Sequence, residues 1–335
     1  AIVMNPNNGE VLAMASLPDF NLNDPMNLSE FYEKEEINNM SSEEKKDFLN
    51  GVWRNFAISD TYEPGSTFKP ITIAAAIEEG ILNRDETFLC EGYKVVHDTR
   101  INCWEKEGHG EQSITEALSN SCNIALMEIG ELIGKELFIK YQKDFGFGQK
   151  TQIDLPGEAS GENLLYNVNA MGPVELATNS FGQTFNVTPL QLITSISSLI
   201  NGGELLEPHL VKQIVDEDGR NIKSIDKKVV KKVVSKQTAD IVKNYMFEAV
   251  LEGTGQKAQI SGYEIGGKTG TAEKGFPRGK DKYIVSFVGF TPIENPEVIV
   301  LVVVDEPQVK DYDSRYASEI FKEIMTNILP YLNIY

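Results

Sequence analysis

The sequence has little cysteine, histidine or tryptophan, with three, three and two residues among 335. Three cysteines are too few for a scaffold built on disulfides. Long hydrophobic runs are also missing, because the longest one, Val298 to Val304, is far too short to span a bilayer. Basic charge is in deficit as well, since 31 Lys and Arg face 50 Asp and Glu, which gives a net charge of −19. Such a chain repels a phosphate backbone, so nucleic acid is not an expected partner.

The remaining composition is that of an ordinary globular protein. Hydrophobic residues make up 41% and charged residues 24% of the chain, values close to the globular average. A length of 335 residues fits two domains or one large α/β unit. The chain opens directly on the strand-like run Ala1 to Met4 with no signal peptide before it, so we expect it to be part of a longer protein.

Strand patterns lie at both ends of the chain and helical patterns lie between them. The expected strands are residues 1–4, 10–15, 268–273, 283–290 and 297–304, and the expected helices are residues 42–51, 65–80, 113–119, 123–134, 188–200, 236–252 and 314–329. Residues 17–40 resemble a surface loop, and residues 216–232 a solvated hairpin or loop. The pattern predicts one sheet covered by helices with an all-helical lobe inserted.

The first candidate for chemistry is an S-x-x-K pattern, Ser66 and Lys69, at the start of an apolar helix. At this spacing the hydroxyl and the amine lie on one face of the helix, and a neutral lysine can activate a serine as a nucleophile. The alternative is an N-cap serine with a surface lysine. A second match, Ser42 and Lys45, lies on an exposed helix and is interpreted as chance.

Two further patterns follow the first. Ser121 and Asn123 form an S-x-N in the break between two helices, where the alternative is that Asn123 is an N-cap. A K-T-G-T pattern from Lys268 to Thr271 begins a strand, and Gly270 would let the backbone of a ligand lie close. Its alternative is the edge of a hairpin. S-x-x-K, S-D-N and K-T-G together are typical of class A β-lactamases and penicillin-binding proteins.

The chain resembles the transpeptidase domain of class B (monofunctional) penicillin-binding proteins, in the division and sporulation branch of Gram-positive bacteria. The resemblance covers nearly the whole chain. The stretches that carry it are AIVMNPNNGEVLAMASLPDF, RNFAISDTYEPGSTFKP, GHG at 108–110, SFGQTFNVTPLQL at 180–192, NGG at 201–203 and GGKTGTAEK at 266–274.

The resemblance implies an α/β fold of the α+β type, a five-stranded antiparallel sheet covered by helices. Residues 1–335 would be one transpeptidase domain, with the sheet from about residues 1–18 and 260–330 and the helical lobe from about 55–255. A membrane anchor and a pedestal domain would precede it and hold it at the extracytoplasmic face of the cell membrane. The implied partners are peptidoglycan stem peptides, β-lactam antibiotics and a glycosyltransferase of the cell-wall machinery.

The resemblance also assigns roles to the motif residues. Ser66 would attack the penultimate D-Ala of a stem peptide, and Lys69 would accept its proton if burial and the charge of Lys268 lower the pKa of Lys69. Ser121 would relay a proton to the leaving D-Ala, and Asn123 would hold the substrate amide. Lys268 and Thr269 would bind the terminal carboxylate, and the N–H groups of Ser66 and Thr271 would form the oxyanion hole. No cofactor is expected for the chemistry.

Two departures bear on rival functions. Cys122 stands where class A β-lactamases have Asp, and the stretch from Glu162 to Tyr166 lacks the Asn of their deacylation loop, so we interpret Glu162 as a surface residue. The rivals to a D,D-transpeptidase are a serine β-lactamase, a β-lactam-sensing receptor domain and a scaffold with a vestigial site.

Cys90, Cys103 and His109 crowd between the first two motifs and predict a structural zinc site. A fourth ligand is needed; we expect His97 or Asp98, place Asp98 in the set, and regard Cys122 as less favoured. The alternatives are a disulfide or unpaired buried thiols. Zinc here would hold the loop that leads to Ser121 and would not activate water.

Overall fold

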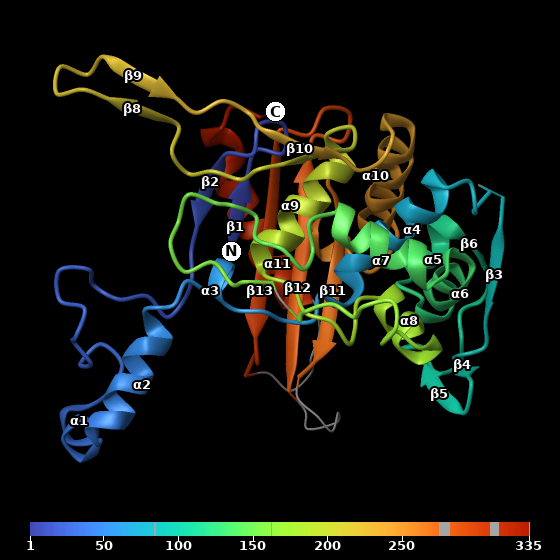
Figure 1. Cartoon of the computed structure of the whole chain (residues 1–335), viewed down its shortest axis with the longest axis horizontal. Coiled ribbons are helices and arrows are strands. Elements are labelled where there is room, and N and C mark those ends of the chain that lie inside the picture. The colour runs from blue at the N-terminus through green and yellow to red at the C-terminus, as the bar shows by residue number, and fades with distance from the viewer. Residues whose placement is uncertain (84, 162, 275–281, 309–314, 335) are drawn as a thin grey trace.

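The centre of the molecule is a five-stranded sheet. A computed structural model describes residues 1–83, 85–161, 163–274, 282–308 and 315–334. The sheet has the order β11-β12-β13-β1-β2, and each neighbouring pair is antiparallel (Figure 1). Its strands are β1 (Ile2–Met4), β2 (Val11–Met14), β11 (Gly266–Glu273), β12 (Tyr283–Thr291) and β13 (Val298–Asp305). The predicted sheet, joined from the N-terminal hairpin and the last three strands, is confirmed.

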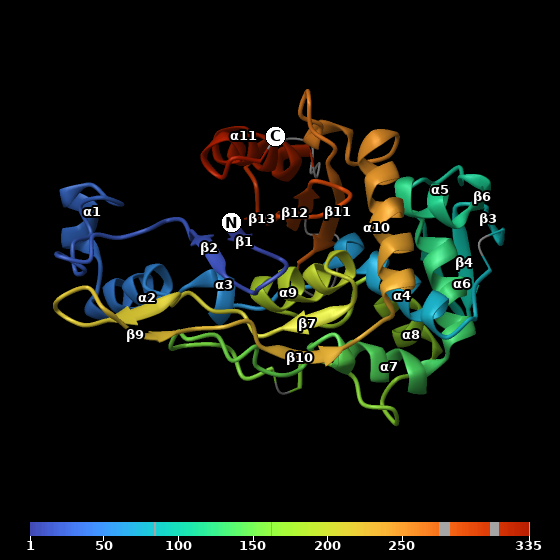
Figure 2. The same ribbon diagram turned by 90° about the horizontal axis from the view of Figure 1, so that it is seen from above.

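The central strands are apolar on both faces because helices cover both faces. On one face Phe287 of β12 contacts Phe321 of α11 (Arg315–Tyr331), with ring centroids 4.7 Å apart. On the other face Val288 and Phe290 join a larger core that includes α9 (Pro189–Ile200). Figure 2 shows the sheet between these two helices.

The other core helices form a lobe beside β11 (Figure 2). They are α4 (Lys69–Glu78), α5 (Ile114–Ser119), α6 (Asn123–Ile133), α7 (Lys135–Asp144), α8 (Pro173–Ser180) and α10 (Lys236–Leu251), with the 3-10 turns η1 (Gly65–Phe68) and η2 (Gln256–Ala258). Helix α3 (Phe56–Ser59) lies apart from them and contacts α9. Helix α4 is buried on every face from Lys69 to Ala76, as predicted, and Pro70 lies in its first turn. Ser113 and Glu116 form the predicted capping box of α5.

The lobe is not all-helical, and this part of the prediction is wrong. Within the lobe, strand β3 (Thr87–Cys90) pairs with β6 (Gly110–Ser113), and β4 (Tyr93–Val96) pairs with β5 (Thr99–Asn102). Next to α9, β7 (Glu204–Leu206) pairs with β10 (Val229–Lys232). Strands β8 (Gln213–Val215) and β9 (Asn221–Ser224) form an exposed hairpin that overlaps the predicted hairpin or loop at 216–232. These strands are three or four residues long, so a period of two is hard to recognise in the sequence.

An arm that extends away from the sheet carries two further helices, α1 (Lys34–Asn39) and α2 (Ser42–Val52) (Figure 1). The first lies inside the predicted loop 17–40, where a capping box formed by Glu33 and Glu36 stabilises a helix of only six residues. Among the described residues, no helix combines the length and the apolar composition needed to cross a bilayer.

Candidate active site and cysteine–histidine cluster

Ser66 lies on η1, which is pressed against the edge strand β11. Gly65 adopts a positive φ of 57°, and a Cβ there would lie 2.6 Å from the carbonyl oxygen of Thr271. The N–H of Gly65 donates to the carbonyl of Gly182 at 2.8 Å. Only glycine fits this contact, so Gly65 brings the backbone of Ser66 next to that of Thr271. The two predicted oxyanion-hole donors therefore belong to segments in direct contact.

Lys69 is fully buried at the start of α4. Its Nζ lies 2.6 Å from the carbonyl oxygen of Ser121, 2.8 Å from Oδ1 of Asn123 and 3.2 Å from Oγ of Ser121. None of its hydrogen bonds goes to Ser66 in the described part of the chain. Burial lowers the pKa of Lys69 from its ordinary 10.5 to about 8, because removing an ammonium from water disfavours its charge. The alternative of a surface lysine is excluded.

Ser121 stands between two buried lysines. Its Oγ lies 3.2 Å from Nζ of Lys69 and 3.0 Å from Nζ of Lys268. The residue has a positive φ of 54° in the connection between α5 and α6, a conformation that is uncommon for a non-glycine residue and frequent at functional sites. The N-cap of α6 is Cys122, whose Sγ accepts from the N–H of Ala125. Asn123 is therefore not the cap, and its side chain faces Lys69 instead.

Lys268 is also fully buried, on β11. Besides Ser121, its Nζ contacts the carbonyl oxygen and Oγ1 of Thr269 at 3.3 and 3.2 Å. Burial, and next the charge of Lys69, lower the pKa of Lys268 well below its ordinary value. The sequence predicted that the charge of Lys268 lowers the pKa of Lys69, but the structure shows the charge of Lys69 lowering the pKa of Lys268. Burial is the larger cause of the lowered pKa for both lysines.

Gly270 is needed for a reason other than the predicted one. A Cβ there would lie 2.5 Å from Oγ of Ser286, 2.9 Å from Cγ2 of Thr67 and 3.0 Å from the carbonyl oxygen of Pro64. The space beside this glycine is filled by the η1 segment and β12 of the protein itself. Gly270 therefore allows η1 to pack on β11, rather than a ligand to approach it.

The outer edge of β11 is free within the described sheet, because β11 is the first strand in its order. A cavity of about 800 Å³ adjoins the end of this edge. Its lining includes Tyr62 and Glu63, which precede Ser66, and Ala272 to Lys274, which follow Thr271. An extended peptide could pair with the edge and fill the cavity while its carbonyl lies at Ser66.

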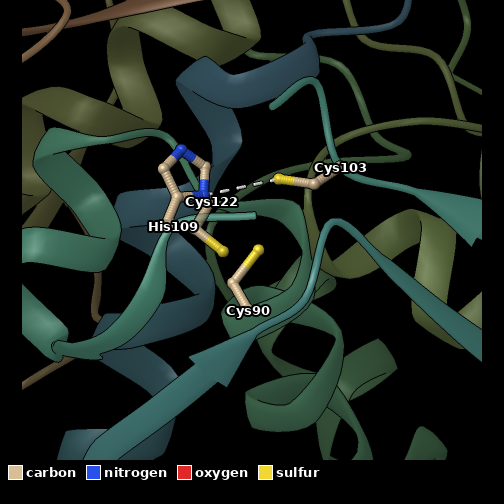
Figure 3. Close-up of side chains that lie close together, drawn as sticks. All are labelled: Cys90, Cys103, His109 and Cys122. Carbon is tan, nitrogen blue, oxygen red and sulfur yellow. Dashed lines mark hydrogen bonds between the residues drawn. The ribbon is translucent and has the colours of Figure 1, made fainter. Parts of the chain in front are cut away.

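A second group of side chains gathers behind Ser121. The ligand atoms of Cys90, Cys103, His109 and Cys122 all lie within 4.8 Å of one another, and Figure 3 shows them pointing toward a common space. Sγ of Cys103 is 3.7 Å from Nδ1 of His109. All three cysteines are free and buried, so the disulfide alternative is not realised in the structure. The contact between Cys103 and Cys122 lowers the pKa of the Cys103 thiol and raises that of Cys122.

The predicted fourth ligand, Asp98, does not join this cluster. Asp98 and its neighbour His97 are exposed in the turn between β4 and β5. The short β4–β5 hairpin carries them away from the cluster, whereas the connection between α5 and α6 brings in Cys122. Asp98 was expected as the fourth member because it is close in sequence to the other three. In the structure the fourth member is Cys122.

The sequence motifs missed two residues that contact the site. Thr254, between α10 and η2, places its Oγ1 2.9 Å from Oγ1 of Thr269 and 3.4 Å from Nζ of Lys268. Trp104 donates its indole N–H to the carbonyl of Asn120 at 2.9 Å, directly before Ser121. Both contacts depend on the tertiary structure, and only the Gly253-Thr254-Gly255 turn offered a weak signal. Glu162 lies outside the described residues, so its predicted surface position stays a prediction.

The comparisons with known proteins agree with this geometry. The family model described as "Penicillin binding protein transpeptidase domain" matches residues 1–326. The chain is 41% identical over 340 residues to stage V sporulation protein D of Bacillus subtilis, covering 100% of this chain and 49% of that protein. It is 30% identical over 340 residues to peptidoglycan D,D-transpeptidase FtsI of Escherichia coli, covering 100% of this chain and 51% of that protein.

A solved structure gives the same result. Penicillin binding protein 3 from Mycobacterium tuberculosis, complexed with aztreonam, superposes with a TM-score of 0.82 at 25% identity, covering 99% of this chain and 72% of that one. The chain belongs to the penicillin-binding protein transpeptidase family, as the resemblance predicted. It spans about half the length of the curated relatives it matches.

Proposed function

We propose that this domain is a serine D,D-transpeptidase that cross-links peptidoglycan stem peptides and is acylated by β-lactams. The observation that carries the proposal is the arrangement of Lys69, Ser121 and Lys268, three buried groups joined by hydrogen bonds next to the Ser66 turn. Two buried amines that contact the same hydroxyl are costly in free energy when both are charged, because burial and their mutual repulsion disfavour the charged forms. One of them is therefore suited to act as a base.

Acylation would proceed as follows. As Oγ of Ser66 bonds to the carbonyl carbon of the penultimate D-Ala, its proton passes to the neutral amine of Lys69. Lys69 can keep donating two hydrogens, to the carbonyl of Ser121 and to Asn123, while its lone pair accepts this proton. The backbone N–H groups of Ser66 and Thr271 would hold the oxyanion, each typically contributing about 3 kcal/mol.

The leaving group needs a proton. When the C–N bond breaks, Ser121 donates its hydroxyl proton to the D-Ala amine and takes a proton from Lys69, 3.2 Å away. Lys69 is then neutral again. The amine of a second stem peptide attacks the Ser66 ester, a peptide bond forms, and the proton of that amine returns to Ser66 through the same groups.

Substrate binding would use β11. A bound carboxylate favours the charged form of Lys268, because it brings an opposite charge next to the buried amine. Lys268 in this form and the hydroxyl of Thr269 would bind the terminal carboxylate of the substrate. Asn123 would bind the peptide amide, and the cavity beyond Thr271 would hold the rest of the donor stem peptide. No cofactor would take part in the chemical steps.

The test is acyl transfer from a D-Ala-D-Ala stem-peptide analogue to a free amine. The transpeptidase proposal predicts a new peptide product that depends on Ser66. Rapid hydrolysis of a penicillin adduct with many turnovers would instead support a β-lactamase. A long-lived adduct without any peptide transfer would support the sensing domain, and the absence of an adduct would support a vestigial scaffold.

We also propose that Cys90, Cys103, His109 and Cys122 bind a structural zinc ion. Three thiols and one imidazole form a common structural set, and a tetrahedral zinc with bonds of about 2.3 Å separates its ligand atoms by about 3.8 Å. The side chains fit this set, because their ligand atoms lie within 4.8 Å of one another and Nδ1 of His109 faces Sγ of Cys103 at 3.7 Å. Zinc would hold Cys122, and with it Ser121.

Metal analysis of the purified domain tests the zinc proposal. We expect one zinc per chain, retained on desalting and removed by a strong chelator together with part of the thermal stability. A metal-free chain with the same melting temperature would contradict it. If the Trp53→Phe variant is used, Trp104 is the sole tryptophan, so its fluorescence reports on this loop during metal removal.

For the cellular role, the relatives favour sporulation. Identity is 41% to the sporulation protein and 30% to FtsI, so we propose a role in the spore wall rather than the septum, at the outer face of the membrane and beside a glycosyltransferase. A Bacillus subtilis strain whose stage V sporulation protein D carries this domain in place of its own tests the role. Heat-resistant spores are expected, and their absence despite acylation of the chimera would contradict it.

A further inference from the structure

Thr254 connects three parts of the site although it belongs to none of the motifs. It lies in the turn that follows α10. Its N–H donates to the carbonyl of Ser119 at 3.0 Å, two residues before Ser121. Its Oγ1 lies 2.9 Å from Oγ1 of Thr269 and 3.4 Å from Nζ of Lys268.

The position of Thr254 is fixed tightly. A Cβ on the preceding Gly253 would lie 2.4 Å from the carbonyl oxygen of Ser119 and 2.8 Å from its Cα. The turn therefore packs directly against the end of α5. The hydroxyl of Thr254 is held at a set distance from β11 rather than resting on a mobile loop.

The donors and acceptors determine which way the protons point. Lys268 only donates while it is protonated, and it faces Oγ1 of both Thr254 and Thr269. One of these two hydroxyls must donate to the other. If Thr269 donated to Thr254, the hydroxyl proton of Thr269 would be used in a hydrogen bond within the protein and could not be donated to a ligand. If Thr254 donates to Thr269, the proton of Thr269 is left free for a ligand carboxylate, and the chain of hydrogen bonds is polarised in that direction.

We propose that Thr254 is a positioning residue that makes the hydroxyl of Thr269 a donor toward the substrate carboxylate. The proposal rests on the proposed function, because it assumes that Lys268 and Thr269 bind that carboxylate. It predicts that losing the Thr254 hydroxyl weakens the recognition of the carboxylate rather than the chemistry at Ser66.

The test compares acylation by benzylpenicillin, which carries the carboxylate, with acylation by its methyl ester, which does not. In Thr254→Val the preference for the acid over the ester should fall about ten-fold, the size expected for one hydrogen bond to a charged group. Thr254→Ser should restore most of the preference. Thr194→Val is the matched control, since Thr194 is a buried threonine of α9 whose hydroxyl has no partner in the described part of the chain.

The outcomes separate the alternatives. Equal losses with acid and ester, or no loss with either, would overturn the role of Thr254 while leaving the transpeptidase proposal intact. Failure of the unmodified domain to be acylated on Ser66 would instead overturn the proposed function. Melting temperatures of the Thr254 variants show whether the folded protein is being compared. If Thr254→Val is unstable, Thr254→Ala also removes the hydroxyl and is expected to show the same fall in preference.

Discussion

At the scale of single residues, the site depends on how a buried amine is discharged. Lys69 is surrounded by oxygen acceptors, which stabilise its charge, yet burial lowers its pKa to about 8. At that value about one molecule in ten has a neutral Lys69 at pH 7, against about one in 3,000 at the ordinary pKa. Burial alone therefore supplies a usable population of base.

The acylation rate constant should follow the neutral fraction of Lys69. Because the group must lose its proton to act, the rate should rise with pH by about ten-fold per unit below pH 7 and level off above about pH 8. Stopped-flow acylation by a chromogenic cephalosporin at pH 5.5–9 measures this. A rate that falls as pH rises through this range would contradict a lysine base, and Lys69→Ala should abolish the pH-dependent step.

At the scale of elements, the contact between η1 and β11 decides whether Ser66 meets its oxyanion hole. Both segments approach through glycines, Gly65 on one and Gly270 on the other. The local pattern identified the two motifs, whereas their contact was expected only from the family resemblance, because the two segments are about two hundred residues apart in the chain.

Gly270→Ala should therefore disable the site. Its new Cβ would overlap Ser286, Thr67 and Pro64, and β11 would have to move away from η1. We expect acylation to slow at least ten-fold, since a displacement of about 1 Å can cost far more. Gly51→Ala is the control: in α2 it has nothing within 4 Å, and it should stabilise the protein by about 0.5–1 kcal/mol. Equal acylation rates for both variants would contradict the account.

The cysteine–histidine cluster joins three other elements: β3, the loop before β6, and the connection between α5 and α6. Cys90→Ser should therefore lose zinc and lower the melting temperature, while Asp98→Ala should keep both unchanged, because Asp98 is exposed at the β4–β5 turn. Zinc content and differential scanning calorimetry measure the pair. Loss of zinc from Asp98→Ala would restore the ligand set that the sequence had suggested.

At the scale of the whole molecule, the two faces of the sheet have separate tasks. The lobe face carries the site, whereas α11 closes the opposite face around Phe321 and Phe287. Phe321→Ala should lower the free energy of unfolding by about 3–5 kcal/mol through the cavity it leaves. Denaturant titration measures that loss. The acylation rate constant of the folded variant should stay close to that of the unmodified domain. A large fall in that rate constant would show that the two faces of the sheet are coupled.

Much of this architecture could be predicted from the sequence. The apolar runs of β12 and β13, the buried helix α4 and the capping box at Ser113 are local patterns, so local rules were sufficient. The motif residues Ser66, Lys69, Ser121, Asn123 and Lys268 carried enough chemistry to be recognised, and the structure places their segments together.

What could not be predicted depends on long-range packing. The short strands of the lobe are stabilised by their partners rather than by their own pattern. Cys122 joins the cluster because a helix connection brings it there, and Thr254 enters the site from a turn with no chemical motif. The residue types show that Cys122 can be a metal ligand and that Thr254 can form hydrogen bonds. Only the fold determines which other side chains these two residues contact.

The central claim is that Ser66 is the nucleophile, and mass spectrometry of the penicillin-treated domain tests it most directly. We expect one penicilloyl group per chain, located by peptide mapping on Ser66, and none on Ser66→Ala. A penicilloyl group on Ser66→Ala, or one that maps to another residue of the unmodified domain, would contradict it.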